Sequence, residues 1–584
     1  MRIFLSLCLF PFFLFLSCGE EPTGFPPFSG EVSDNINLNQ VGIYPDGQLR
    51  FSVITFSAVK DTLAPAAAPP ELSTYYLTNS AGDRRLAEGP LGELRDWKSV
   101  GGVMAHYTER AAPPVGSYRI YVPGVGYSHE FRVGEEVLQD VFVASMKSNY
   151  FQRAGQELLK EHAGIYARPA GHPDTEVYFH PSSGRSGITS SPGGWYDAGD
   201  FNKYIVNAAF PLSQYLTLYE DIGDPLPDGS LNIPESGNGK SDFLDELRYE
   251  LDWMLTMQDD DGGLFHKLTT LNFEGMVMPH EATNQRYIVG KGTAATLDFA
   301  GAAAQAARVF QEEDPVYADQ LLAAAERAWE WAVENTDVAF QNPEDVSTGQ
   351  YGDRNFSSEQ TFATAELLVT TGEERFLIAL REHPPVVRYR SGESWTAFMG
   401  QLGVFSLLRH EGAIPEPIRA DLSGQVLGVA DSLVTVIDTS AYHQPVNRFV
   451  WGSTSDVLNA AMVLCAAYDQ EPKPAYLAAV RASVDYIFGH NPLGVSYVTG
   501  HGDKTPMFIH HRASAADGID APIPGFLSGG ANIGQQDKSS TTYPRYAAPM
   551  QSWADQEPSY ASNEICLNWN APLTYVLGWL EARQ

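Results

Sequence analysis

The spacing of apolar residues changes once along this chain, and the change divides it into two parts. Between 32 and 142, short runs of alternating apolar and polar residues, such as LRFSVITF and GSYRIYVPG, are separated by Gly, Pro and Asn or Asp. This pattern predicts an immunoglobulin-like β-sandwich. From 143 onward apolar residues recur at three and four positions, as in DFLDELRYELDWMLTMQ, which predicts a domain built of helices.

About twelve helices are expected between 143 and 584, each apolar over much of its face. An even number of such helices suggests hairpins that close into a toroid. Long connections at 164–199, 259–290 and 490–562 are where function is expected, because long loops in compact domains usually carry it. Besides the helix in the run quoted above, helices are expected at 298–310, 316–335, 359–371, 395–410, 416–437, 454–468, 473–488 and 569–582, and after 143, 200, 288 and 373.

The charge balance restricts the partners of this protein. The chain has 38 basic and 72 acidic side chains, which gives a net charge of −34. Such a surface repels phosphate backbones and anionic membranes, so nucleic acid is not an expected partner and a neutral substrate fits better. Its four cysteines include Cys8 and Cys18 in the N-terminal apolar stretch, so no disulfide framework is expected.

The first 18 residues predict a cleaved export signal, followed by a short linker at 19–31. The apolar stretch is too short for a comfortable membrane span, and its end, Phe15 to Cys18, resembles a bacterial lipobox whose cysteine is lipidated. Glu20 and Glu21 resemble the export tag of surface lipoproteins. We therefore expect an exported outer-membrane or cell-surface lipoprotein that contacts the membrane only through Cys18. An ordinary secretory signal is the alternative.

The first candidate site is the segment GGWYDAGDFNKY at 193–204. Its two carboxyl groups, Asp197 and Asp200, are close enough to raise each other's pKa, so that one can be held while the other accepts a proton from water. The alternative is structural, with Asp200 as a helix N-cap and Asp197 in a turn. The flanking aromatic residues favour a sugar site, because aromatic rings stack against sugar faces.

The second candidate site lies in SYVTGHGDKTPMFIHHR at 496–512. His510 and Arg512 can hold sugar hydroxyl groups by hydrogen bonds. Adjacent histidines could also bind a metal, but His510 and His511 lack the further ligands that a zinc site needs. Two surface histidines without a role are the third interpretation.

The third candidate site is Glu564, within WADQEPSYASNEICLNWNAPL at 553–573. Its apolar neighbours Ile565, Leu567 and Trp569 disfavour the ionised carboxylate, which raises the pKa as a general acid requires. The alternative is a glutamate that the dipole of a helix N-terminus stabilises.

Together these segments resemble glycoside hydrolase family 9, in the subtype with an N-terminal immunoglobulin-like domain. The resemblance extends from about Ile36 to the C-terminus, and Cys566 departs from it, since the family has a small Ser, Thr or Ala there. Two loop motifs carry the resemblance. The first contains Ser496, Val498, Thr499, Gly502, Lys504, Ile509, His510 and Arg512. The second contains Trp553, Asp555, Tyr560, Glu564, Asn570 and Ala571.

The resemblance implies an (α/α)6 barrel and an inverting, endo-acting hydrolase of β-1,4-linked glucan. Glu564 would be the general acid, Asp200 the base and Asp197 its helper. His510 and Arg512 would bind sugar hydroxyl groups, with Trp451, Tyr497 and Tyr560 in neighbouring subsites. The alternatives are an exo-acting β-glucosidase, cellobiohydrolase or glucosaminidase of the same family, and a non-catalytic glycan-binding lipoprotein.

No cofactor is expected for catalysis, and two structural metals have to be considered, zinc from the resemblance and calcium from an oxygen-rich run. Zinc is not expected, because Ala154, Arg168 and Gly171 stand where related enzymes have ligands, which leaves only His172. One interpretation of TGQYGDRNFSSE is a calcium site with Thr348, Asp353 and Glu359 as ligands. A solvated acidic loop is the other interpretation.

Overall fold

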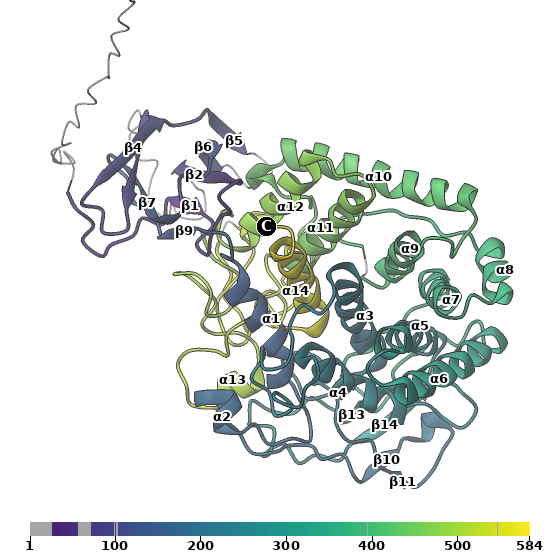
Figure 1. The fold of residues 1–584 in the computed structure, drawn as a ribbon. Helices are drawn as coiled ribbons and strands as arrows, with labels where there is room; N and C mark the ends of the chain where they lie inside the picture. Colours follow the sequence, from purple (N-terminus) through teal and green to yellow (C-terminus); the bar gives the residue numbers. More distant parts are fainter. Residues whose placement is uncertain (1–25, 57–71, 98–99, 101–102, 394, 546) are drawn as a thin grey trace, which may run out of the picture.

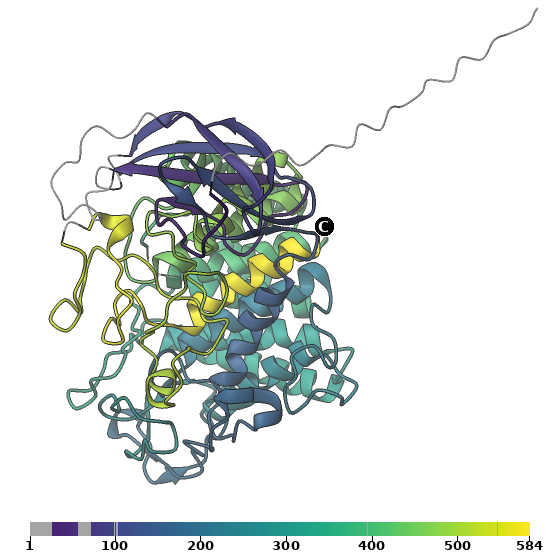
Figure 2. The same ribbon diagram turned by 90° about the vertical axis from the view of Figure 1, so that its left-hand side faces the viewer.

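The computed structural model describes residues 26–584 except 57–71, 98–99, 101–102, 394 and 546 (Figure 1). Strands form a sandwich before residue 134 and long helices follow, which confirms the predicted order of a β-sandwich and a helical domain. Figure 2 shows the sandwich against one end of the helical domain. The expected signal, Cys18 and the first part of the linker lie outside the described residues.

Two antiparallel sheets make the immunoglobulin-like sandwich. Their inner faces follow the predicted alternation, so that Phe51, Leu77 and Ile120 are buried between the sheets. The first sheet has the order β1(Ile36–Leu38), β2(Gln48–Phe56), β6(Val103–Ala111) and β5(Leu94–Trp97), and the second has the order β4(Arg85–Pro90), β3(Thr74–Asn79), β7(Gly116–Val122) and β8(Gly126–Tyr127), with β9(Phe131–Val133) also paired to β7.

Twelve helices of nine residues or more form the described part of the barrel in two rings. The inner helices are buried over most of their length, and α14 pairs with α3 and α11, while α3, α5, α7 and α9 follow one another. They are α3(Ile205–Ile222), α5(Thr293–Phe310), α7(Ser357–Thr371), α9(Met399–Arg409), α11(Ser453–Gln470) and α14(Leu567–Glu581). The outer helices are α1(Gln139–Phe151), α4(Asp242–Thr256), α6(Pro315–Glu334), α8(Glu374–Glu382), α10(Glu416–Thr439) and α12(Pro474–Ile487).

The structure corrects two boundaries and adds a sheet. Helix α1 begins at Gln139, so the barrel starts before the predicted position 143. The helix expected after 288 is instead strand β14 (Tyr287–Lys291), and α5 begins only at Thr293. The added sheet has five strands of two to five residues, which are too short to give a periodic signal in the sequence. The sheet has the order β11(Ile188–Thr189), β10(Val177–Phe179), β14, β13(Phe265–Thr269) and β12(Lys203–Tyr204).

Short helical turns complete the described chain. Helices α2(Lys160–Ala163) and α13(Arg512–Ala516) and the 3₁₀ turns Gly164–Tyr166, Pro181–Ser183, Trp395–Phe398, Ala441–His443 and Pro549–Gln551 lie in loops. Among the described helices, α10 alone has the length and hydropathy of a membrane span. Its buried stripe, Leu422, Val426, Ala430, Leu433 and Ile437, repeats every three or four residues. That spacing is typical of an amphipathic outer helix of a barrel.

Buried polar contacts join the sandwich to the barrel. Arg50 on β2 forms an ion pair with Asp485 on α12 at 2.9 Å, and Asn39 donates to the same carboxylate at 2.9 Å. The Gln40 side-chain amide donates to the carbonyl of Gly494 at 2.9 Å, and its oxygen accepts from the Lys504 backbone at 2.9 Å. The sandwich therefore binds the loop that continues to His510.

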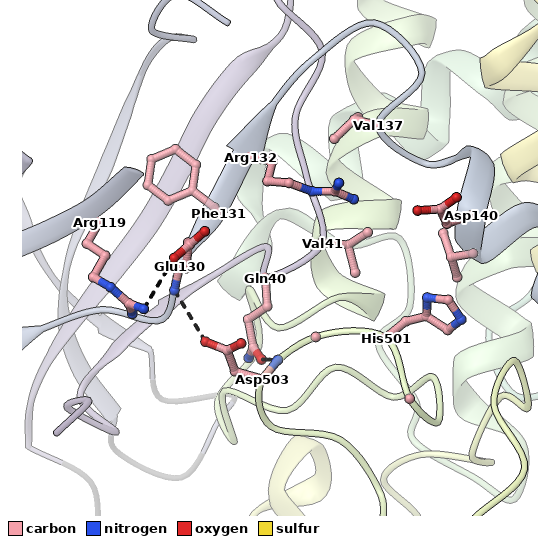
Figure 3. A pocket seen from close by; sticks show the side chains of 13 residues that line it. Gln40, Val41, Arg119, Glu130, Phe131, Arg132, Val137, Asp140, His501 and Asp503 are labelled. Carbon is pink, nitrogen blue, oxygen red and sulfur yellow. Dashed lines mark hydrogen bonds and ion pairs between the residues drawn. The ribbon is translucent and has the colours of Figure 1, made fainter. Parts of the chain in front are cut away.

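A polar hollow of about 390 Å³ lies beside these contacts, between the two domains (Figure 3). Arg119 and Glu130 form an ion pair at 3.4 Å on its sandwich side. On the barrel side, Asp503 lies 3.2 Å from the ring of His129. The 500–503 segment is therefore in contact with the sandwich as well as with its own domain.

We predict that Arg50→Met destabilises the folded protein by about 3 kcal/mol, because it leaves the buried carboxylate of Asp485 without its cation. Chemical denaturation followed by circular dichroism measures the loss. Arg85→Met is the control, since Arg85 and Glu88 form an exposed pair at 3.5 Å and such pairs contribute little. Equal stability of the two variants would contradict the importance of the interface ion pair.

Candidate active site

A cavity of about 740 Å³ lies where the long loops meet at one end of the barrel. All three predicted catalytic residues line it, as do four of the five predicted substrate-binding residues. The lining residues are Asp197, Ala198, Asp200, Tyr204, Phe273, Gly349, Gln350, Tyr351, Trp451, His510, Arg512, Tyr560, Glu564, Cys566, Asn568 and Trp569.

Backbone hydrogen bonds fasten the three predicted segments to one another. The amide of Leu567 donates to the carbonyl of Asp197 at 2.9 Å, and Ala198 forms an antiparallel bridge with Cys566. The amide of Arg512 donates to the carbonyl of Gly199 at 3.0 Å. Because these hydrogen bonds join backbone atoms, they fix the positions of the three segments that carry the carboxyl groups.

Gly199 lies at the closest approach of the three segments. A Cβ atom there would stand 2.1 Å from the carbonyl oxygen of His510 and 3.2 Å from Oε1 of Glu564. Only glycine fits, so the glycine of the DAGD sequence allows both other segments to reach the aspartates.

Asp197 is fully engaged by two donors. The hydroxyl of Tyr351 donates to its Oδ2 at 2.7 Å, and the side-chain amide of Asn207 donates to its Oδ1. Burial raises the pKa of Asp197 to about 8, and the charge of Asp200 adds to the shift. The hydrogen bonds from Tyr351 and Asn207 act in the opposite direction and favour the ionised form.

Asp200 is also buried, and burial raises its pKa. The nearby guanidinium of Arg512 and a hydrogen bond from Asn202 act in the opposite direction and favour the ionised form. Asn202 is itself fixed, because its oxygen accepts from the Thr269 hydroxyl at 2.9 Å and from the Thr270 amide at 3.0 Å. Asp200 is therefore the member of the pair suited to accept a proton.

Glu564 has the properties of a proton donor. Burial raises its pKa well above the ordinary value, and the charges of Asp200 and Asp197 raise it further. Glu564 and Asp200 thus lie in one cavity with different charged neighbours, an arrangement that suits one acid and one base.

His510 and Arg512 contribute to the cavity in different ways. His510 Nδ1 lies 2.8 Å from the carbonyl of Glu557 and donates to it, which leaves Nε2 as an acceptor for a sugar hydroxyl. Burial lowers the pKa of His510 to about 4, so the ring is neutral near pH 7. Arg512 donates to the backbone carbonyls of Gly199 at 2.8 Å and Glu274 at 3.0 Å, so it braces two loops as well as facing Asp200.

Aromatic side chains line the outer part of the cavity. The Trp451 side chain is 42% exposed, and its ring lies 5.4 Å from that of Tyr560. Phe273, which the sequence motifs did not indicate, is 47% exposed on another loop. Its position within the long 259–290 connection was the only signal that could have found it. Such rings suit the stacking of sugar residues.

The prediction that Tyr497 binds substrate is wrong. Its side chain is fully buried, and its ring packs at 6.2 Å from Tyr486 and at 5.8 Å from Trp553. The backbone of Tyr497 bonds to Ile487 and Ser528 beneath the cavity, which directs the ring into the core.

The three predicted calcium ligands do not form one site. The Thr348 hydroxyl accepts a hydrogen bond from the ammonium of Lys267 at 3.1 Å, which places a cation where the metal was expected. Asp353 instead accepts from the Thr396 hydroxyl at 2.7 Å, and burial raises the pKa of Glu359 to about 8. Within the part of the chain that the structure describes, no group of three acidic, histidine or cysteine side chains could hold a metal.

The region where related enzymes were expected to have zinc ligands is held by other contacts. The guanidinium of Arg168 donates to the carbonyl of Arg153 at 2.7 Å, and His172 Nδ1 lies 2.8 Å from the hydroxyl of Tyr196. The absence of zinc stays a prediction.

Comparison with known proteins gives one consistent result. The family profile described as Glycosyl hydrolase family 9 matches residues 139–577, which include the whole candidate site. A xyloglucan-specific endo-β-1,4-glucanase from Bacteroides ovatus is 36% identical over 585 residues, covering 95% of each chain. Endoglucanase D from Acetivibrio thermocellus is 34% identical over 469 residues, covering 79% of this chain and 72% of its own. A metagenome-derived glycoside hydrolase family 9 endoglucanase has a crystal structure with a TM-score of 0.85 and 32% identity, covering 94% of this chain and 99% of that chain.

We predict that Gly199→Ala abolishes most hydrolytic activity while the barrel stays folded, because the added methyl group must push the His510 segment away from the aspartates. Initial rates and circular dichroism of the same preparation test this. Gly424→Ala on the exposed face of α10 is the control, since a Cβ there meets nothing within 4 Å. Wild-type rates for Gly199→Ala would contradict the close approach.

Proposed function

Because the chain belongs to glycosyl hydrolase family 9, we propose that it is an inverting endo-β-1,4-glucanase with Glu564 as general acid and Asp200 as general base. The observation that carries the proposal is the placement of these two carboxyl groups in one cavity, where the charges of both aspartates favour the protonated form of Glu564, and Arg512 and the hydrogen bond from Asn202 favour the ionised form of Asp200. Glu564 protonates the glycosidic oxygen while Asp200 takes a proton from the attacking water. The chain's own groups supply both steps, so the reaction needs no cofactor.

The surroundings of the acid and the base support a polysaccharide substrate. Trp451, Tyr560 and Phe273 offer ring faces for sugar residues, and His510 offers an acceptor for a hydroxyl group. The Bacteroides ovatus relative is named for xyloglucan, and we propose that this chain also acts on a soluble β-1,4-glucan such as xyloglucan.

The experiment for this proposal follows product formation from xyloglucan, mixed-linkage β-glucan and cello-oligosaccharides. An endo-acting enzyme lowers the viscosity of the polymers early, whereas an exo-acting enzyme releases only glucose or cellobiose from chain ends. NMR of the first product should show the α-anomer, because inversion converts a β-linkage in one step. A β-anomer at early times would reject both the mechanism and Asp200 as base.

Substitution of the acid and of the base should have different signatures. We predict that Glu564→Gln slows substrates with poor leaving groups by 10²-fold or more, on the order expected for general acid catalysis, and aryl glycosides much less. Asp200→Asn should slow both, because the attacking water still needs a base. Glu557→Gln, which changes a neighbouring glutamate whose side chain does not line the cavity, is the control.

The pH dependence of the wild-type enzyme should be bell-shaped. Activity is lost at low pH as Asp200 becomes protonated, and at high pH as Glu564 loses its proton, since both pKa values are raised. An alkaline limb that persists unchanged in Glu564→Gln would contradict the role of that residue.

We further propose that the protein is exported and anchored by a lipid on Cys18. Support comes from the short apolar segment that ends at this cysteine and from Glu20 and Glu21 behind it. Cys18→Ser should move the protein from the membrane fraction to the soluble fraction, whereas Cys8→Ser within the same apolar segment should not. Unchanged fractionation of Cys18→Ser would reject the anchor.

A further inference from the structure

Lys267, in the middle of strand β13, is a buried lysine without an acidic partner. Its side chain is inaccessible to solvent. Among the described residues no carboxylate lies within ion-pair distance of it, although Asp200 is near enough to attract its charge. Burial lowers the pKa of Lys267 to about 7. A charged group that is unfavourable to bury in this way requires strong compensating contacts.

All three compensating hydrogen bonds go to a single loop, residues 340–351. The ammonium donates to Oδ1 of Asn342 at 2.8 Å, to the hydroxyl of Thr348 at 3.1 Å and to the carbonyl of Gly349 at 2.8 Å. An ammonium has three N–H groups, so its donors are fully used. The rings of Tyr204 and Phe340 lie 5.5 Å and 5.7 Å from the nitrogen and add cation–π attraction.

The 340–351 loop ends at the tyrosine that contacts the catalytic pair. Tyr351 donates to Asp197 at 2.7 Å, and both Gly349 and Tyr351 line the cavity. The backbone of Tyr351 has a φ of +45°, a left-handed conformation that is unfavourable for a residue with a large side chain. Such a conformation persists only where the surrounding contacts hold it, and Lys267 supplies three of them two to nine residues upstream.

The geometry points to Lys267 as a positioning residue for hydrolysis, which holds the 340–351 loop so that Tyr351 keeps its hydrogen bond to Asp197. This inference rests on the proposed function of the same site. Lys267 is not among the residues that line the cavity, so it acts through Tyr351.

The inference predicts a loss of turnover rather than of binding. In Lys267→Met the three acceptors of the loop lose their donor, the loop relaxes, and Asp197 loses the Tyr351 hydroxyl. The aromatic residues Trp451, Tyr560 and Phe273 belong to other segments, so KM for a cello-oligosaccharide should change little. We expect kcat to fall about tenfold or more, comparable to the fall in Tyr351→Phe.

A double-mutant cycle separates this role from a general structural one. If Lys267 acts through Tyr351, the double variant Lys267→Met/Tyr351→Phe should be no slower than the slower single variant. Lys267→Arg should recover part of kcat, because a guanidinium can donate to the same acceptors. Lys291→Met is the matched control, since this lysine on neighbouring strand β14 binds Asp259 and Asp261 and should keep wild-type kcat.

Each outcome decides the inference. Independent effects that multiply in the double variant, or a normal kcat in Lys267→Met, would overturn it. If Lys267→Met does not fold, Asn342→Ala replaces it in the cycle, because Asn342 is partly exposed and offers the ammonium one of its acceptors. A wild-type enzyme without any glucanase activity would reject the proposed function itself, which these comparisons between active variants do not test.

Discussion

The structure depends on the electrostatic repulsion between three carboxyl groups that lie together in one cavity. Carboxylates this close cannot all be ionised, so burial and mutual charge raise the pKa values of Asp197 and Glu564. Arg512 favours ionisation of both Asp200 and Glu564, and the hydrogen bond from Asn202 adds to this effect at Asp200. The different partners of otherwise similar groups thus provide both an acid and a base.

The arrangement requires a rigid support, and the helical domain provides it through buried ion pairs behind the catalytic loop. Lys203 binds Asp174 at 2.8 Å and also donates to the carbonyl of Gly193 at 2.7 Å. On the other side, Glu246 accepts from the indole of Trp195 at 2.9 Å and pairs with Arg153 at 3.0 Å. These contacts hold both ends of the segment that carries the aspartates.

The sequence was informative where the structure is periodic or where a motif is local. The alternation before residue 134 and the apolar helices after it predicted both domains, and the motifs around Asp200 and Glu564 predicted two groups that share the cavity. Tyr351 and Lys267 were not found, because their importance arises from contacts between a loop and a five-residue strand that no period reveals. The prediction for Tyr497 was wrong for a related reason, because a sequence motif does not show which way a side chain points.

The contact between Gln40 and the 494–504 segment means that the catalytic domain is supported by residues outside the part of the chain that the family profile matches. The family profile begins at residue 139. About a hundred residues earlier, the side chain of Gln40 donates to the carbonyl of Gly494 and accepts from the backbone amide of Lys504. An enzyme shortened at the domain boundary would keep every catalytic side chain. It would lose the hydrogen bonds from Gln40 to the segment that leads to His510. For protein engineering, the sandwich is therefore to be treated as part of the catalytic module, and it can be exchanged only for a domain that presents the same polar edge.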